Sequence, residues 1–200
     1  MNIALFDYGA GNLHSLGKAL EAEGAQVTVT AAWDQALSLD ALVLPGVGAF
    51  GAAAAALPGD RSPILRALED GLPCLGICLG MQLLFDTSEE SAGDGIGLVP
   101  GQVRRLGTTV VPQMGWNDVE TSDDPLFGSV APLVAYYANS FVCEPTAPDD
   151  AIAWSEYEGA RFTAAVRKRR TWGVQFHPEK SSERGRRLLA NWVALAGGRS

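Results

Sequence analysis

Cys78 stands between two glycines, in the segment Gly76-Ile77-Cys78-Leu79-Gly80. The apolar run 72–77 predicts a strand, and residues 81–85 predict a helix. A cysteine on such a strand-to-helix bend has the geometry of a nucleophile elbow, because glycines let the backbone bend sharply and let neighbours approach. A helix N-terminus beneath the sulfur would favour the thiolate. A buried structural cysteine beside a tight turn is the alternative that this segment leaves open.

The chain has two histidines, and only one of them is placed to act as a general base for this cysteine. His14 opens a predicted helix in a polar segment, where surface exposure is expected. His177 ends the apolar strand pattern 172–176, and strand ends are where open α/β sheets keep their active sites. Glu179 would share its face in extended backbone and orient the ring. Taken alone, a His-Pro-Glu segment is best interpreted as a strand-end histidine followed by a solvated glutamate. Because an elbow cysteine is also present, we predict a triad of Cys78, His177 and Glu179.

Composition narrows the class of protein. Two hundred residues, 47% hydrophobic and 19% charged, predict one globular domain over residues 1–200. A net charge of −8 disfavours nucleic-acid binding. The absence of a long apolar window and of a leader-like N-terminus predicts a cytoplasmic protein that does not cross a membrane.

The cysteine count and the basic run predict no special chemistry of their own. Three cysteines suit a reducing compartment. Cys74 and Cys78 are four apart, but with one suitable histidine and no second cysteine pair we predict no metal, and we expect no cofactor. The basic run 167–170 interrupts two strand patterns and predicts a solvated hairpin turn rather than a phosphate site.

The order of predicted elements defines the fold class. The first half alternates strands and helices, which predicts an α/β fold with an open, mostly parallel, flavodoxin-like sheet flanked by helices. Closely spaced strands between residues 98 and 175 predict antiparallel strands added to one edge, and a helix over 182–196 ends the pattern. The expected earlier elements are strands 2–6, 26–30 and 41–44 and helices 13–23, 52–56 and 64–70.

Two glycine-rich turns follow predicted strands. The segment 7–12 contains G-x-G, but the third glycine of a dinucleotide fingerprint is missing, so that function is disfavoured. Pro45-Gly46-Val47-Gly48 follows a strand that can lie beside the elbow. Backbone N–H groups of this turn and of Leu79 could therefore face a developing oxyanion. An ordinary strand-to-helix turn is the alternative.

The elbow segment 76–82 and the base segment 173–179 together resemble the class I, triad-type glutamine amidotransferase family. Segments 7–13, 45–48, 112–117 and 177–181 extend the resemblance over residues 2–189, towards the glutaminase subunits that supply ammonia to a cyclase in histidine biosynthesis. Gln113 and Asn139 depart from the family, in which histidine is frequent at both positions.

The resemblance implies a glutaminase mechanism. Cys78 would attack the side-chain carboxamide of glutamine, and His177 would protonate the departing ammonia. Water would then hydrolyse the glutamyl thioester while Glu179 orients the ring. The implied oxyanion donors are Val47, Gly48 and Leu79, and the implied glutamine-binding residues are Gly48, Gln82 and Glu90.

A partner subunit is expected because ammonia released into neutral water becomes unreactive ammonium, and the chain has no recognisable acceptor site. The resemblance implies a heterodimer with a (β/α)₈-barrel cyclase, with Asn12, Trp116, Tyr136 and Lys180 facing it. The alternative for the two aromatic residues is an ordinary core position.

Three other functions stay open at this level. The chain could serve a different synthase of the same class, for anthranilate, aminodeoxychorismate or nucleotides. It could be a non-catalytic regulator or binding module with this fold, although an intact triad disfavours that interpretation. It could also be a cysteine peptidase or amidase, which would differ in its choice of substrate.

Overall fold

The computed structural model describes residues 1–9, 13–46 and 48–198. The strands are β1 (Asn2–Phe6), β2 (Gln26–Thr30), β3 (Ala41–Leu44), β4 (Cys74–Ile77), β5 (Thr87–Ser88), β6 (Gly101–Arg105), β7 (Gln113–Thr121), β8 (Leu133–Asn139), β9 (Phe141–Pro145), β10 (Ala151–Tyr157), β11 (Ala160–Lys168) and β12 (Thr171–Val174). The α-helices are α1 (His14–Ala22), α2 (Trp33–Leu37), α3 (Phe50–Ala55), α4 (Ser62–Glu69), α5 (Leu79–Gln82) and α6 (Ser182–Gly197). Short 3₁₀ turns are η1 (Pro125–Phe127), η2 (Pro148–Asp150) and η3 (Pro178–Lys180).

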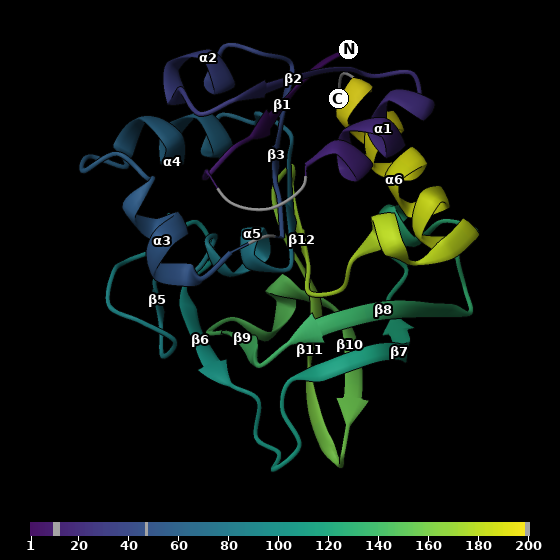
Figure 1. Ribbon diagram of the computed structural model, residues 1–200. Helices are drawn as coiled ribbons and strands as arrows, with labels where there is room; N and C mark the ends of the chain where they lie inside the picture. The colour runs from purple at the N-terminus through teal and green to yellow at the C-terminus, as the bar shows by residue number, and fades with distance from the viewer. Residues whose placement is uncertain (10–12, 47, 199–200) are drawn as a thin grey trace.

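One sheet runs through the described residues in the order β2-β1-β3-β4-β12-β11-β10-β7-β8 (Figure 1). The neighbours from β2 to β12 are parallel, and those from β12 onward are antiparallel. Strands β9, β6 and β5 branch from β11. The predicted parallel sheet with antiparallel strands added to one edge is confirmed.

Helices cover both faces of the parallel half, because successive side chains in a strand point to opposite faces. Ile3 and Leu5 belong to the core cluster that includes the buried faces of α1 and α6. Ala4 and Phe6 belong to the cluster that includes α3 and α4. Figure 1 shows α1 and α6 on one side of the strands and α2, α3 and α4 on the other.

Three parallel strands end at the same edge of the sheet. β4 lies between β3 and β12. Cys74 at its start is paired with Leu42 of β3 and with Thr171 of β12. The chain continues from their carboxyl ends into Gly46, Cys78 and His177, which places these residues together although they are far apart in sequence.

The predicted elements differ from the structure in three places. The helix expected over 81–85 begins earlier, at Leu79, and ends at Gln82 after a single turn. Neither α2 nor β5 was predicted, because five and two residues are too short for a periodic apolar pattern. None of the helices in the described ranges is long and apolar enough to cross a membrane.

The basic run 167–170 ends β11 and turns into β12, which agrees with the predicted hairpin turn. Its side chains stay partly or fully exposed, but they also bind neighbouring protein groups. Arg167 pairs with Asp124 at 2.8 Å, and Lys168 with Asp150 at 2.9 Å. Arg170 donates to the carbonyl oxygens at the end of α6. The run therefore joins the hairpin to its neighbours.

Candidate active site

Cys78 occupies a strained elbow between β4 and α5, with φ 48° and ψ −106°. Its N–H donates to the carbonyl oxygen of Val174 at 2.7 Å, which extends the β4–β12 ladder to the bend. A β-carbon on Gly76 would lie 2.6 Å from the carbonyl oxygen of Gly80, and one on Gly80 would overlap that of Leu44. Both glycines are therefore required by close backbone approach, as expected for a nucleophile elbow.

The one-turn helix α5 changes the expected source of thiolate stabilisation. A helix of four residues has few aligned peptide dipoles, so its N-terminal field is weak. Leu79 is the first residue of this turn, and its N–H has no partner within the helix. It remains a proposed oxyanion donor, next to the sulfur.

His177 and Glu179 are joined by a hydrogen bond of 2.8 Å between Nδ1 and Oε1. The sequence predicted that these two side chains would meet, and they do. The extended backbone predicted between them was wrong, because Pro178–Lys180 form a 3₁₀ turn that brings the carboxylate back to the ring. Burial lowers the pKa of His177, but hydrogen bonds and negative charge from Cys78 and Glu179 outweigh burial and raise that pKa to about 9. The ring therefore holds a proton readily beside the sulfur.

Cys78 and His177 are neighbours across the carboxyl ends of β4 and β12. A β-carbon on Gly46 would lie 2.8 Å from Cβ of Cys78 and 3.0 Å from Cε1 of His177, so one methyl group would touch both. Both side chains are almost completely buried. The three side chains predicted to form a triad therefore lie together, and Gly46 leaves room for them.

Ser181 and Gln175 are buried polar residues near the triad that sequence reasoning missed. The hydroxyl of Ser181 donates to the carbonyl oxygen of His177 at 2.6 Å and accepts from the N–H of Tyr136 at 2.9 Å. The amide of Gln175 donates to Sγ of Cys78 at 3.4 Å. Their positions beside His177 in sequence were the available signal.

Other cysteines do not compete as nucleophiles. Burial raises the pKa of the Cys74 thiol, and burial followed by the negative charge of Cys78 raises that of Cys143. No group of three or more His, Cys, Asp and Glu side chains in the described ranges is arranged to hold a metal. His14 is exposed at the start of α1.

A cavity of about 230 Å³ opens beside the sulfur. Its lining includes the predicted substrate and oxyanion residues Gly48, Leu79, Gln82 and Glu90. Gly48 has φ 100°, a conformation that favours glycine. Glu90 accepts a hydrogen bond from the N–H of Phe50, the first residue of α3, at 2.9 Å. The structure therefore brings these predicted residues together, whereas Val47 lies outside the described residues.

Gln113 and Asn139, the departures from the family, lie directly opposite each other on β7 and β8. Both are buried, and Asn139 lines the cavity. Both polar atoms of the Gln113 amide and Oδ1 of Asn139 have no partner within the described residues. Of these atoms, Oδ1 of Asn139 belongs to a residue that lines the cavity, whereas Gln113 is not part of its lining.

An exposed aromatic and apolar patch lies on the β7–β8 hairpin. It consists of Met114, Trp116 and Val134. The ring of Tyr136 lies edge-on to that of Trp116, with 6.1 Å between the ring centres. The Lys180 ammonium lies 5.9 Å from the centre of the Tyr136 ring. Trp116 is 55% exposed, so the alternative of a core aromatic is wrong for this residue. Asn12, the other predicted partner residue, lies outside the described residues.

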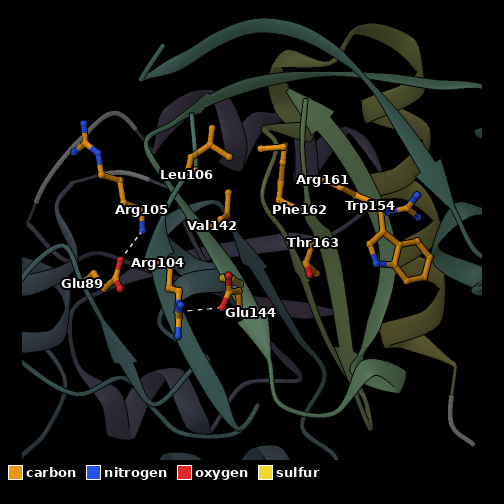
Figure 2. Close-up of a pocket in the computed structure, with 13 residues that line it drawn as sticks. Glu89, Arg104, Arg105, Leu106, Val142, Glu144, Trp154, Arg161, Phe162 and Thr163 are labelled. Atoms are coloured by element: carbon orange, nitrogen blue, oxygen red, sulfur yellow. Dashed lines mark hydrogen bonds and ion pairs between the residues drawn. The ribbon is translucent and has the colours of Figure 1, made fainter. Parts of the chain in front are cut away.

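A larger cavity, of about 600 Å³, lies away from the triad between the β6–β9 and β10–β11 pairs (Figure 2). Arg104 pairs there with Glu144 at 3.0 Å, and Arg161 stacks on Trp154 at 5.5 Å. Its one cysteine, Cys143, is a buried thiol with a raised pKa. The nucleophilic chemistry is therefore assigned to the smaller cavity.

The family model described as "Glutamine amidotransferase class-I" matches residues 4–195. The fold and the elbow site define the same class, and the chain belongs to the class I glutamine amidotransferase family.

Within this family it resembles the protein named imidazole glycerol phosphate synthase subunit HisH. It is 43% identical to HisH of Gloeobacter violaceus, over 100% of this chain and 92% of the relative. It is also 43% identical to HisH of Methanothermobacter thermautotrophicus, over 96% of this chain and 98% of the relative.

Solved structures give the same fold. A crystal structure of a glutamine amidotransferase superposes with a TM-score of 0.77 at 17% identity, covering 98% of this chain and 100% of the other. PurLQS from Thermotoga maritima gives 0.78 at 19% identity, covering 96% and 97%. At these identities the likeness supports the fold alone.

Proposed function

We propose that this chain is the glutaminase subunit of imidazole glycerol phosphate synthase. It hydrolyses glutamine to glutamate and ammonia and passes the ammonia to a cyclase subunit, which makes imidazole glycerol phosphate and aminoimidazole carboxamide ribonucleotide in histidine biosynthesis. The observation that carries the proposal is the placement of His177 between Glu179 and the elbow cysteine Cys78. The relatives named HisH support the choice of this synthase.

In the first half-reaction, the Cys78 sulfur attacks the carboxamide carbon of glutamine while its proton rests on His177. The tetrahedral oxyanion is bound by the N–H groups of Leu79 and of the Val47–Gly48 turn. His177 then gives its proton to the departing nitrogen, so the C–N bond breaks and neutral ammonia leaves. A glutamyl thioester remains on Cys78.

In the second half-reaction, His177 takes a proton from water as the water oxygen attacks the thioester. The C–S bond breaks, glutamate leaves, and the sulfur and ring return to their starting state. Glu179 keeps the ring oriented and stabilises its charged form, which fits the 2.8 Å hydrogen bond and the raised pKa.

Substrate glutamine is bound in the small cavity beside the sulfur. Glu90 supplies a carboxylate for the α-ammonium group, and Gln82 and Gly48 contact the rest of the molecule. The N–H of Phe50 holds Glu90 in place at 2.9 Å. A carboxylate fixed in this way recognises the free amino acid and disfavours a glutamine inside a peptide chain.

The cyclase partner binds at the patch of Met114, Trp116, Val134 and Tyr136, together with Lys180 and Asn12. An exposed tryptophan with neighbouring apolar side chains is typical of an interface centre. We propose a heterodimer with a (β/α)₈-barrel cyclase in the cytoplasm, where the three unpaired thiols stay reduced.

The test is synthesis by the complex with purified cyclase, with either glutamine or an ammonium salt as nitrogen source. Cys78→Ala should abolish glutamine-dependent synthesis and leave ammonium-dependent synthesis intact, since the two reactions use separate sites. Cys74→Ala, which removes a buried thiol outside the site, serves as the matched control and should retain both activities. Glutamine-dependent synthesis by Cys78→Ala, or failure of a cyclase to use this chain at all, would overturn the proposal.

A further inference from the structure

Gln175 is completely buried and reaches the catalytic sulfur, although the sequence predicted for it no role beyond a strand position. Its Nε2 lies 3.4 Å from Sγ of Cys78, and its Oε1 accepts from Nε2 of Gln82 at 3.3 Å. Its backbone N–H is fixed by the carbonyl oxygen of Ala164 at 2.8 Å. The amide therefore joins the nucleophile to a residue of the glutamine cavity.

The direction of these hydrogen bonds follows from one backbone carbonyl. Nε2 of Gln82 also donates to the carbonyl oxygen of Phe141 at 3.3 Å, and a carbonyl oxygen can only accept. Gln82 must therefore turn its NH₂ group towards Phe141 and Gln175. Gln175 must then turn its oxygen towards Gln82, which leaves its NH₂ group facing the sulfur.

We propose that Gln175 is a further catalytic residue, whose amide donor is held towards Sγ of Cys78 by Gln82 and the Phe141 carbonyl and stabilises the thiolate. The proposal rests on the glutaminase function, in which Cys78 is the nucleophile. A donor fixed on a charged acceptor favours its charged form. It acts twice, on the attacking thiolate and on the thiolate that leaves when the thioester breaks.

Some charged and titratable groups around this sulfur favour its thiolate form, and others disfavour it. His177 faces it from the loop after β12, with Glu179 behind the ring. Cys143 approaches from β9 as a neutral thiol, and Glu90 lines the same cavity. Because α5 is a single turn, its dipole does little to offset the nearby carboxylates. A directed amide donor adds to the stabilisation that His177 provides at the elbow.

The experiment measures alkylation of Cys78 by iodoacetamide as a function of pH, in the full-length chain without glutamine. Gln175→Leu removes the donor at similar volume, and Gln175→Glu places a carboxylate beside the sulfur. We expect the pH midpoint of alkylation to rise in Gln175→Leu and to rise further in Gln175→Glu. The rate at neutral pH should fall ~10-fold or more in Gln175→Glu, since one unit of pKa is a tenfold change in thiolate. A Gln175→Leu midpoint equal to that of the unaltered chain would overturn the proposal, because the carboxylate of Gln175→Glu raises the midpoint by charge repulsion alone.

Three further variants keep the result interpretable. Gln82→Leu removes the group that orients Gln175 and should raise the midpoint in the same direction, whereas Gln26→Leu, an exposed position on β2, should not. Cys78→Ala identifies the labelled thiol, and thermal unfolding checks that each variant folds. If Gln175 variants misfold, the Gln82→Leu midpoint decides the outcome. Alkylation requires no turnover, so a chain that failed to hydrolyse glutamine would contradict the proposed function without altering this measurement.

Discussion

Tyr136 and His177 form an isolated antiparallel bridge, in which the N–H of His177 donates to the carbonyl oxygen of Tyr136 at 2.8 Å. Ser181 closes the arrangement, because its hydroxyl bonds both to the Tyr136 N–H and to the His177 carbonyl. Tyr136 belongs to the proposed partner surface, and His177 belongs to the proposed triad. The backbone of the proposed general base is thus attached directly to the strand that we expect to contact the cyclase.

Ser181→Ala should loosen this attachment. The change removes the acceptor of the Tyr136 N–H, whereas the His177 carbonyl keeps its hydrogen bond from the Lys180 N–H at 3.0 Å. The free energy of unfolding should therefore fall by ~1–3 kcal/mol. We also expect kcat for glutamine hydrolysis in the complex to fall ~10-fold with little change in KM, because the base is less well positioned. Ser38→Ala, which removes a surface hydroxyl bonded to the Gln35 carbonyl, is the matched control. Equal kcat for Ser181→Ala and the unaltered chain would show that the bridge does not position His177.

Gly46→Ala should damage the site more than the fold. The new methyl group would lie 2.8 Å from Cβ of Cys78 and 3.0 Å from Cε1 of His177, so the two must separate. A displacement of this size is expected to reduce kcat ~10²-fold. Gly59→Ala, where the added β-carbon meets nothing within 4 Å, should behave like the unaltered chain. Steady-state glutaminase assays of the two complexes make the comparison, and normal turnover by Gly46→Ala would contradict the described geometry.

Gly80→Ala and Gly17→Ala, both within helices, should change stability in opposite directions. At Gly80 the β-carbon would overlap the carbonyl oxygen of Leu44, which is fixed in β3, so we expect a loss of ~3 kcal/mol or failure to fold. At Gly17 the methyl group would meet Leu5 and Val27 at ordinary contact distances of 3.8 and 3.9 Å. There the higher helix propensity of alanine should add up to ~1 kcal/mol. Urea denaturation measures both; a stable Gly80→Ala variant would refute the elbow packing.

Trp116→Ala should weaken the complex without unfolding the chain. The ring is 55% exposed in the isolated subunit, so little core packing is lost. If it is a central contact with the cyclase, its removal should cost ~2 kcal/mol or more, about 30-fold in Kd. Val29→Ala, at a similarly exposed position on β2, should bind normally. Isothermal titration calorimetry with purified cyclase measures both values, and unchanged affinity for Trp116→Ala would move the interface elsewhere.

Glu179→Gln should alter the pH dependence of stability. The pKa of His177 is raised from 6.5 to about 9 in the folded protein. Protonation of His177 therefore stabilises the folded state, and this contribution is fully present at pH values below the unfolded-state pKa of 6.5. That contribution is lost as the pH rises through about 9. Because Glu179 is one cause of the raised pKa, the variant should be less stable than the unaltered chain by ~1 kcal/mol or more near pH 6.5. The difference should shrink towards alkaline pH, whereas a gap that widened would reverse the assigned sign.

Local chemistry allowed much of this site to be predicted from the sequence. The glycines beside Cys78, the strand before it and the His-Pro-Glu segment each carry their meaning over a few residues. Alternation of strands and helices likewise defined the parallel sheet and the antiparallel extension, because apolar periodicity reports which face each element buries. The resemblance to a known family then connected the two segments.

Contacts between distant segments could not be predicted in the same way. The single turn of α5 ends at Gln82, and η3, rather than extended backbone, brings Glu179 to His177. Sequence patterns do not reveal that Ser181 joins β8 to the base, nor that the Phe141 carbonyl orients two glutamine amides. Each depends on packing between strands separated by tens of residues.

The chain's own residues determined which chemistry is possible, since a thiol, an imidazole and a carboxylate in turn-forming segments define nucleophile, base and orienting group wherever they meet. Tertiary structure decided that they do meet, because β3, β4 and β12 are parallel neighbours whose carboxyl ends lie at one edge of the sheet. It also decided the direction in which Gln175 donates, since the polarity of an amide is set by the groups that surround it.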